Sequence, residues 1–385
     1  MAKTFTHRER VLAALNHQEP DRVPMDLGST TATGITVGAY ERLAQRFAVK
    51  PEIRLVDRMQ QLTVVDERIL QALDTDIRPV WLGQPDHWTD EELPEGGYRD
   101  EWGVVRHKPE GSFYYDLTGS PLAGEITVDQ VVRHKWPDPT DPGRYRNLRE
   151  DVRRLRQQDE YAVILNVPPA FVHTSQYLRG FVDWFMDLRL DPRLAGALMD
   201  AVLEVNLAIA LEAIRQVGDE VDIVRTSDDI GHQRGPMVSL ALYRELIKPR
   251  QKRYFRALHD ATKAKIYYHS CGSVYSLMED LIDVGVDILN PVQVAAAEMD
   301  TARLKRAFGE RICFAGAVDT QRVMPFGSPQ DVTEEVKRRI ADLAPGGGYI
   351  LGAVHNIQPD VPPENIVALY EAGKQYGRYE TLARS

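Results

Sequence analysis

The sequence predicts an α/β protein folded as a (β/α)₈ TIM barrel, and two observations carry that prediction. Short apolar runs of β-forming residues alternate with longer amphipathic stretches along most of the 385 residues, which is typical of a parallel sheet covered by helices. There are eight such runs, the strand count of a closed (β/α)₈ barrel. They are residues 22–28, 76–82, 161–167, 221–228, 265–270, 287–291, 312–317 and 348–353.

The helices predicted between these runs are supported by their expected ends. Ser328 followed by Pro329 is typical of an N-cap with proline at the first helical position. Gly218 and Gly285 stand where a C-terminal glycine stops a helix just before the next strand. The clearest predicted helices are residues 194–217, 240–262, 274–284, 329–343 and 363–376.

Residues 1–385 are interpreted as a single barrel domain with one irregular insertion. Residues 84–142 break the alternation, because they are rich in glycine, proline, aromatic and charged residues with short alternating runs near 98–107 and 112–117. They predict a β-hairpin excursion after strand two. It is expected on the upper face of the barrel or at a subunit contact, which makes a homodimer possible.

Charge and cysteine content exclude several classes of protein. The net charge of −10 argues against a nucleic-acid binder or a basic membrane-surface protein. Two cysteines in so long a chain exclude a disulfide scaffold and favour a reducing compartment. The N-terminus has no apolar signal core, and no run approaches the ~18 apolar residues of a membrane span. We therefore expect a cytoplasmic enzyme that does not enter the membrane.

Polar residues stand at the C-terminal ends of nearly all the predicted strands, where barrels of this type place their chemistry. Singly, such residues often only cap turns and helices, but as a ring they indicate a polar substrate pocket. His232, together with Arg234, lies just past strand four and either holds an anionic substrate or is a solvated loop residue. The strand-end candidates for substrate binding are Asp26, Asn166, Asn290 and Asp319.

His269 and Cys271 form a His-x-Cys pair at the end of the fifth predicted strand. Strand side chains alternate with period two, so both point the same way. His355 ends the eighth strand, and three such ligands at one mouth would make an open catalytic zinc site. Asp228 or Asp229 can supply a fourth, displaceable oxygen ligand and are the catalytic candidates. The alternative is that the cysteine is a small core residue and the histidines are structural.

Cys313 has a different interpretation. It stands at the start of its strand and is therefore expected near the barrel floor as a core residue.

Several motifs resemble the uroporphyrinogen decarboxylase superfamily. They run from about residue 6 to residue 376, and the fold that the resemblance implies is a distorted (β/α)₈ barrel. Its haem-pathway decarboxylases carry an Arg-Gln-Ala-Gly-Arg signature after strand one, whereas residues 25–33 here contain no arginine. The motifs are residues 8–15, 20–24, 235–236 with Tyr243 and Pro249, 268–272, 314–319 and 362–366.

A second branch, the zinc- and corrinoid-dependent methyltransferases, is more similar. Its signature is His-x-Cys plus a later cysteine, and at that later position this chain has His355. The resemblance implies a zinc ion and a methyl group exchanged with a corrinoid on a partner protein. Replacing a thiolate by a neutral imidazole makes the metal a stronger Lewis acid, which favours demethylation of an ether- or hydroxyl-type substrate over a thiol.

Two other functions remain open at this point. A carboxy-lyase would need no metal, would use Asp26 or Asp228 to hold a pyrrole nitrogen, and would have an arginine-lined pocket. A non-catalytic barrel that binds a small molecule or a corrinoid carrier would bind its ligand without turnover.

Overall fold

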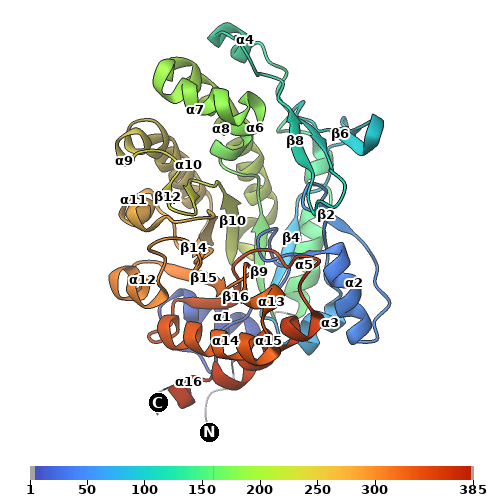
Figure 1. Cartoon of the computed structure of the whole chain (residues 1–385), viewed down its shortest axis with the longest axis vertical. Helices are drawn as coiled ribbons and strands as arrows, with labels where there is room; N and C mark the ends of the chain where they lie inside the picture. The colour runs from blue at the N-terminus through green and yellow to red at the C-terminus, as the bar shows by residue number, and fades with distance from the viewer. Residues whose placement is uncertain (1–4, 159, 383–385) are drawn as a thin grey trace.

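Seven parallel strands form the curled central sheet of the protein (Figure 1). The computed structural model describes residues 5–158 and 160–382. The strand order is β16-β15-β14-β13-β10-β9-β4, so neighbours in the sheet are consecutive barrel strands along the chain. The α/β barrel prediction is therefore confirmed. The strands are β4 (Ile77–Trp81), β9 (Ala162–Asn166), β10 (Ile223–Ser227), β13 (Lys265–His269), β14 (Ile288–Asn290), β15 (Cys313–Val318) and β16 (Tyr349–Ala353).

The eighth predicted strand, residues 22–28, is an extended segment and not a regular strand. It still joins the two edges of the sheet, because Asp26 N donates to Leu351 O (2.9 Å) and Asp76 N donates to Met25 O (2.8 Å). Pro24 has no N–H to give to a ladder. The segment therefore closes the barrel with isolated bridges.

Helices cover the outside of the sheet, and most predicted ones are present. The helix predicted over 240–262 is instead divided into α9 (Leu240–Leu242), a π-helical turn η4 (Tyr243–Ile247) and α10 (Lys248–Ala261). Pro249 lacks the N–H for an i→i−4 bond, which accounts for the change of register there. The other outer helices are α2 (Val37–Arg46), α3 (Glu67–Ala72), α5 (Leu148–Gln158), α6 (Val172–Arg179), α7 (Phe181–Leu190), α8 (Pro192–Val217), α11 (Met278–Val284), α12 (Thr301–Phe308), α13 (Val323–Phe326), α14 (Pro329–Leu343), α15 (Pro363–Tyr376) and α16 (Tyr379–Leu382).

The insertion is larger than the predicted hairpin. It forms a four-stranded antiparallel sheet in the order β5-β6-β7-β8, beside which the chain continues to α4 at one tip of the molecule (Figure 1). A further small sheet, β1-β3-β2, comes from residues for which no strand was expected. The strands are β5 (Glu91–Leu93), β6 (Gly97–Arg99), β7 (Val105–His107), β8 (Asp116–Gly119), β1 (Ile35–Thr36), β2 (Leu55–Asp57) and β3 (Leu62–Thr63); α4 is Val128–Val132.

Helix α1 (His7–Leu15) packs against the floor of the barrel. Val11 and Leu15 join the buried cluster of inward-facing strand residues that includes Cys313. The Cys313 Sγ lies 3.6 Å from Leu15 O. Cys313 is thus a core residue near the floor, as predicted.

Helix α8 is more apolar than the sequence analysis expected. Within the described residues, the stretch Pro192–Glu220 is long and apolar enough by composition to cross a membrane, with a mean hydropathy of 1.8. However, 67% of the apolar 18-residue window within this stretch is buried inside the protein. Its apolar side chains therefore serve as the packing surface of an outer helix of the barrel.

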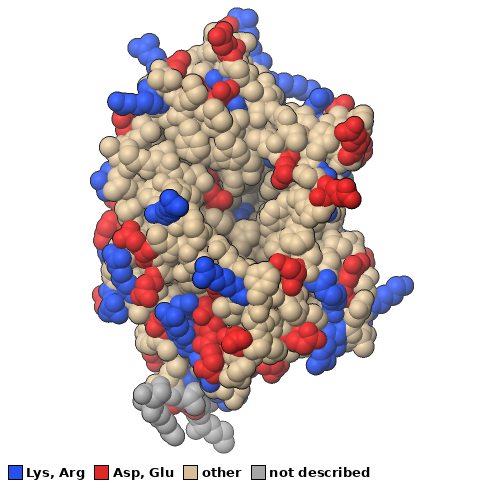
Figure 2. Space-filling model, viewed as in Figure 1, with Lys and Arg blue, Asp and Glu red and all other residues tan. Residues whose placement is uncertain are grey.

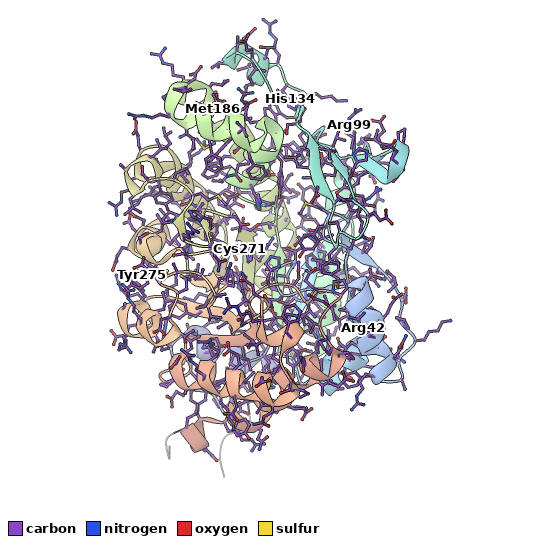
Figure 3. The ribbon with its side chains drawn as sticks, viewed as in Figure 1. Arg42, Arg99, His134, Met186, Cys271 and Tyr275 are labelled. Carbon is purple, nitrogen blue, oxygen red and sulfur yellow. The ribbon has the colours of Figure 1, made fainter. Side chains whose placement is uncertain are left out.

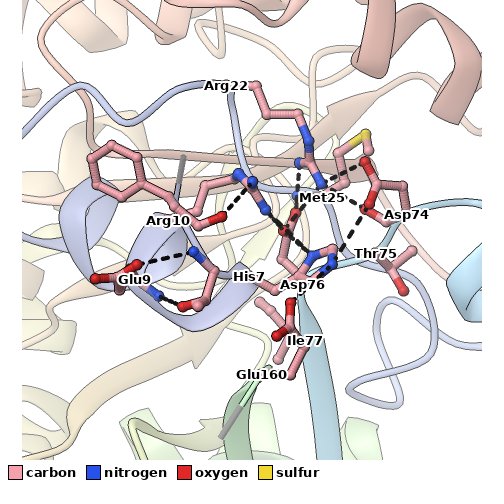
Figure 4. Close-up of polar contacts among 12 residues, drawn as sticks. His7, Glu9, Arg10, Arg22, Met25, Asp74, Thr75, Asp76, Ile77 and Glu160 are labelled. Atoms are coloured by element: carbon pink, nitrogen blue, oxygen red, sulfur yellow. Dashed lines mark hydrogen bonds and ion pairs between the residues drawn. The ribbon is translucent and has the colours of Figure 1, made fainter. Parts of the chain in front are cut away.

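Asp76 is the centre of a buried ionic network that ties α1 to the closing segment and to β4 (Figure 4). Its carboxylate forms ion pairs with Arg10 at 2.6 Å, with Arg22 at 2.7 Å and with His7 Nδ1 at 2.7 Å. It also accepts the N–H of Met25 at 2.6 Å. Burial by itself would raise the Asp76 pKa, but Arg22, His7 and Arg10 outweigh burial and lower the pKa to about 2.

Asp76→Asn is therefore expected to lower the free energy of unfolding by about 3–5 kcal/mol, because it leaves buried cations without their counter-charge. An unfolded aspartate titrates near ~3.9, above the folded pKa. The stabilisation is thus complete above pH ~5 and disappears as the pH falls towards the folded pKa. Urea unfolding as a function of pH should show this slope in the wild type and a flatter one in the variant. Asp129→Asn, at an exposed pair with Arg133, is the control, and an equal effect of both changes would contradict the prediction.

Candidate metal centre and active-site cavity

The C-terminal ends of the barrel strands open into a cavity of about 490 Å³. Figure 2 shows the molecule hollowed near the middle of the face in view, with acidic and basic atoms visible inside the hollow. Its walls come from the barrel strands, from the segment around Asp57 and from the insertion, including Arg106 and Tyr115. The insertion therefore lies on the upper face, one of the two places predicted for it.

The three predicted metal ligands lie together at this mouth. His269 ends β13, Cys271 follows two residues later, and His355 follows β16; Figure 3 labels Cys271 near the middle of the molecule. The three ligand atoms all lie within 4.8 Å of one another. His269 Nε2 and Cys271 Sγ are 3.4 Å apart, close to the ~3.5 Å that tetrahedral zinc with bonds of ~2.1 and ~2.3 Å imposes. One thiol and two imidazoles are a donor set that zinc accepts.

Asn290 fixes the tautomer of His269. The two residues are paired across β13 and β14, and His269 Nδ1 lies 2.6 Å from Asn290 Oδ1. The Asn290 amide Nδ2 donates to Ala315 O at 3.3 Å, so its oxygen is the atom that faces the imidazole. His269 therefore carries its proton on Nδ1 and presents the Nε2 lone pair towards Cys271.

Burial sets the protonation of the cluster. It lowers the pKa of His269 to about 3, although Asp229 opposes the shift, and it also lowers the pKa of His355. Both imidazoles are thus neutral at neutral pH, the form that binds a metal. Burial and the Asp229 charge raise the pKa of the Cys271 thiol well above its usual value. A bound cation would be needed to hold Cys271 as a thiolate, so metal binding here would release a proton.

Two glycines allow the loop after β10 to touch the loop after β13. Gly272 has φ 90°, and a Cβ there would lie 2.5 Å from the Gly231 carbonyl carbon. This close backbone approach brings Asp229 Oδ1 to 2.8 Å from the N–H of Cys271. The same oxygen lies 3.8 Å from His269 Nε2. Asp229 thus lies beside the three candidate metal ligands.

Asp228 faces the other way. Its carboxylate accepts the backbone N–H groups of Phe171 and His173, each at 3.0 Å, at the start of α6. Burial raises its pKa to about 7 against the effect of those bonds. Asp228 does not line the cavity, which corrects the expectation that either neighbouring aspartate can act there. Asp229 does line the cavity, so it alone of the two aspartates remains a candidate.

The remaining predicted substrate residues are dispersed. Asp26 accepts Ser29 Oγ (2.6 Å) and Asn166 donates to Ser29 O (3.0 Å); both are buried and neither lines the cavity. His232, on β11 (Gly231–His232), is exposed, and Asp319 accepts the N–H of Gln321 (2.6 Å) in a turn. Asn290 acts through His269. The polar ring of strand ends is thus not one binding surface.

Comparison with known proteins identifies the family. A family model described as uroporphyrinogen decarboxylase (URO-D) matches residues 114–376, more than half of the chain. The chain belongs to the uroporphyrinogen decarboxylase family. The uroporphyrinogen decarboxylase of Methylococcus capsulatus is 25% identical over 359 residues, 80% of this chain and 96% of that protein. The enzyme of Serratia proteamaculans is 36% identical over 81 residues, which span only 22% of that protein.

A solved structure is similar over almost the full length of the chain. The methyltransferase from Methanosarcina mazei superposes with a TM-score of 0.65 at 18% identity, covering 97% of this chain and 99% of that one. At this identity the likeness establishes the shared fold. This member of the uroporphyrinogen decarboxylase family therefore has the barrel fold of an enzyme family.

The decarboxylases that the sequence resembles carry their signature arginines in the loop after strand one. In this family member the same loop has no arginine and contributes Thr31 and Ala32 to the cavity wall. Arginines nevertheless enter the cavity from elsewhere: Arg106 from β7 and Arg225 from β10. Arg106 pairs with Asp100 at 2.5 Å and covers the ring of Tyr177 at 4.8 Å. The arginine-lined pocket expected of a carboxy-lyase is thus present in part.

Sequence reasoning missed Arg225, His173 and Tyr177 as cavity residues. His173 Nε2 lies 3.0 Å from the Tyr177 hydroxyl and 3.9 Å from Asp229 Oδ2. Arg225 could have been found by counting back from Asp229 in steps of two along its strand. His173 and Tyr177 lie on α6, and no local sequence pattern shows that this outer helix contributes to the cavity wall.

Proposed function

We propose that this protein is a zinc-dependent methyltransferase that moves a methyl group between a small substrate and a corrinoid held by a separate protein. The observation that carries the proposal is the His269–Cys271–His355 cluster, with its ligand atoms within 4.8 Å at the mouth of the barrel. The Methanosarcina mazei neighbour, a methyltransferase by name, supports it. The missing decarboxylase arginines in residues 25–33 support it as well.

Bound zinc would supply a Lewis acid that stabilises negative charge on the substrate heteroatom. The protein's own residues prepare the site for that ion. Asn290 orients His269, and burial keeps both imidazoles neutral. The pKa of Asp229 is lowered although burial opposes the shift, and the carboxylate accepts the N–H of Cys271, so Asp229 stays ionised. It is placed to act as the displaceable fourth ligand.

The single thiolate among the protein ligands favours an ether- or hydroxyl-type substrate. With Cys271 as its one anionic ligand and two neutral imidazoles, a divalent cation keeps one positive charge more than it would with two thiolates. Such a centre polarises an oxygen strongly, whereas it reduces the nucleophilicity of a bound thiolate. We therefore propose that the protein demethylates a small methyl ether.

The size of the cavity supports a separate corrinoid partner. About 490 Å³ lies within the ~300–1,000 Å³ range of small-molecule pockets and suits one small substrate. A corrinoid would then be presented by its carrier protein docked over the mouth. No nucleic acid is involved in this proposal.

A second candidate is a carboxy-lyase of the decarboxylase type, favoured by Arg106 and Arg225 in the cavity and by the names of the curated relatives. It requires no metal. The two functions therefore differ in their response to a chelator.

Metal removal tests the proposal directly. The protein should hold one zinc per chain and should methylate free cob(I)alamin from a methyl-ether substrate, followed by the loss of cob(I)alamin absorbance. Dialysis against a chelator should abolish that transfer, and zinc should restore it. Carbon dioxide release from a carboxylated pyrrole that persists in chelator would instead establish the lyase, and protein that takes up no zinc would refute the methyltransferase proposal.

A further inference from the structure

Arg225 is a buried arginine whose guanidinium has no hydrogen-bond or ion-pair partner among the residues that the structure describes. Its side chain is 7% exposed and lines the cavity. Its Nε is buried without a hydrogen bond. Within residues 5–158 and 160–382, no acidic oxygen lies within ion-pair distance of it. Burying an unpaired charge is strongly unfavourable, so the site is incomplete as the chain alone presents it.

The other buried arginines of the described chain show how exceptional Arg225 is. Every one of them forms an ion pair with an aspartate or glutamate. The same fold thus pairs its buried guanidinium groups wherever they serve structure alone. These arginines are Arg10, Arg22, Arg78, Arg106, Arg144, Arg179 and Arg339.

The two carboxylates that act electrostatically on Arg225 have other hydrogen-bond partners. Asp57 and Asp229 both act on it electrostatically from a distance. Asp57 accepts the backbone and side-chain N–H groups of Gln60 at 2.8 and 2.9 Å. Asp229 accepts the N–H of Cys271 and faces His269. Both carboxylates are thus held by other groups, and neither forms an ion pair with Arg225.

Arg225 faces the same cavity as the metal cluster. Arg225 and Ser227 are alternate residues of β10, Asp229 follows just after the strand, and all three line the cavity. Ser227 is the strand neighbour of His269, which places Arg225 roughly 7 Å further down its strand. A ligand held by Arg225 therefore lies beside the cluster in one cavity.

Aromatic side chains supply the rest of the wall. Tyr115, Tyr177 and Phe181 line the cavity with Arg225, which suits a flat apolar body between the charged end and the metal cluster. Because Arg106 is already paired with Asp100, one guanidinium is available for one anionic group. This favours a monocarboxylate over a polycarboxylate such as a porphyrinogen.

We propose that the substrate is a small methyl ether bearing one carboxylate, and that Arg225 binds this carboxylate through parallel N–H···O bonds. The ether part rests on the proposed function, whereas recognition of the anion does not. Arg225 is then the residue that selects charged over neutral ethers. A planar guanidinium matches a carboxylate in this bidentate way.

Binding measurements with matched ligands test the proposal without turnover. Calorimetry would compare 2-, 3- and 4-methoxybenzoate and methoxyacetate with the corresponding uncharged carboxamides. Zinc-loaded wild-type protein should prefer the carboxylates by at least about tenfold. Arg225→Gln should lose that preference, with carboxylate affinity falling about 10–100-fold, as for a lost hydrogen bond to a charged group. Arg225→Lys should recover part of it.

Two controls separate recognition from structure. Arg234→Gln changes an exposed arginine that follows β10 along the chain and does not line the cavity. This change should leave the preference for carboxylates intact. The thermal midpoint of Arg225→Gln should equal or exceed that of the wild type, because the change removes an unpaired buried charge. A wild type without preference for any carboxylate, or an Arg225→Gln protein that keeps it, overturns the proposal. Protein that prefers carboxylates but takes up no zinc refutes the methyltransferase while leaving the anion site standing.

Discussion

Replacing His269 with alanine is expected to remove zinc from the protein and to abolish methyl transfer. The change deletes one of three ligands whose donor atoms lie within 4.8 Å, and two ligands do not make a stable catalytic zinc site. The affinity for zinc should fall by more than the ~10–100-fold that follows loss of a residue which only orients a ligand. Competition with a chromophoric chelator measures this affinity, and cob(I)alamin consumption measures the activity.

Matched variants make this result specific to the cluster. Cys271→Ser and His355→Ala should behave like His269→Ala. His232→Ala removes an exposed histidine outside the cavity, and Cys313→Ala removes the buried cysteine at the barrel floor; both should keep one zinc per chain. Retention of wild-type zinc affinity in His269→Ala would show that the cluster is not the metal site.

Asp229→Asn is expected to weaken zinc binding by about 10–100-fold, the range for residues that support metal ligands. The asparagine oxygen can still accept the Cys271 N–H, so the loop keeps its shape. What disappears is the negative charge 3.8 Å from His269 Nε2. Zinc affinity by chelator competition, together with methyl transfer at saturating zinc, separates loss of binding from loss of the proposed displaceable ligand.

The neighbouring residue is the control for this change. Asp228→Asn carries the same substitution one position away, at a side chain that does not line the cavity. The single side-chain oxygen of asparagine can accept one of the two N–H bonds from the start of α6, and the other bond is lost. Because Asp228 does not line the cavity, zinc affinity should be unchanged. Equal weakening by both substitutions would mean that Asp229 has no particular role at the metal.

The two aspartates also show where sequence reasoning stopped. Both faces of a barrel strand are buried, one by the interior and one by the helices. Its sequence therefore does not alternate between apolar and polar residues, and the pattern does not show which side chains face the interior. Val224 and Ile223 are both fully buried although they face opposite sides. The sequence therefore left Asp228 and Asp229 as equal candidates, and which of them enters the cavity depended on the packing of α6.

Arg225 was missed for a related reason. The sequence analysis considered only strand ends, because that is where barrels place their chemistry, and Arg225 lies in the middle of β10. A charged residue inside an apolar strand was nevertheless a visible signal. Whether such a residue is paired cannot be judged without the tertiary structure, because its partners come from distant segments.

The sequence alone determined the order of strands and outer helices and the three ligands of the candidate metal site. These follow from local periodicity and from the direction in which strand side chains point. The tertiary structure alone decided that residues 22–28 close the barrel without forming a regular strand and that the insertion walls the cavity. It also assigned Asp228 to a helix end and left Arg225 unpaired. Each of these depends on contacts between residues far apart along the chain, and no local pattern encodes such contacts.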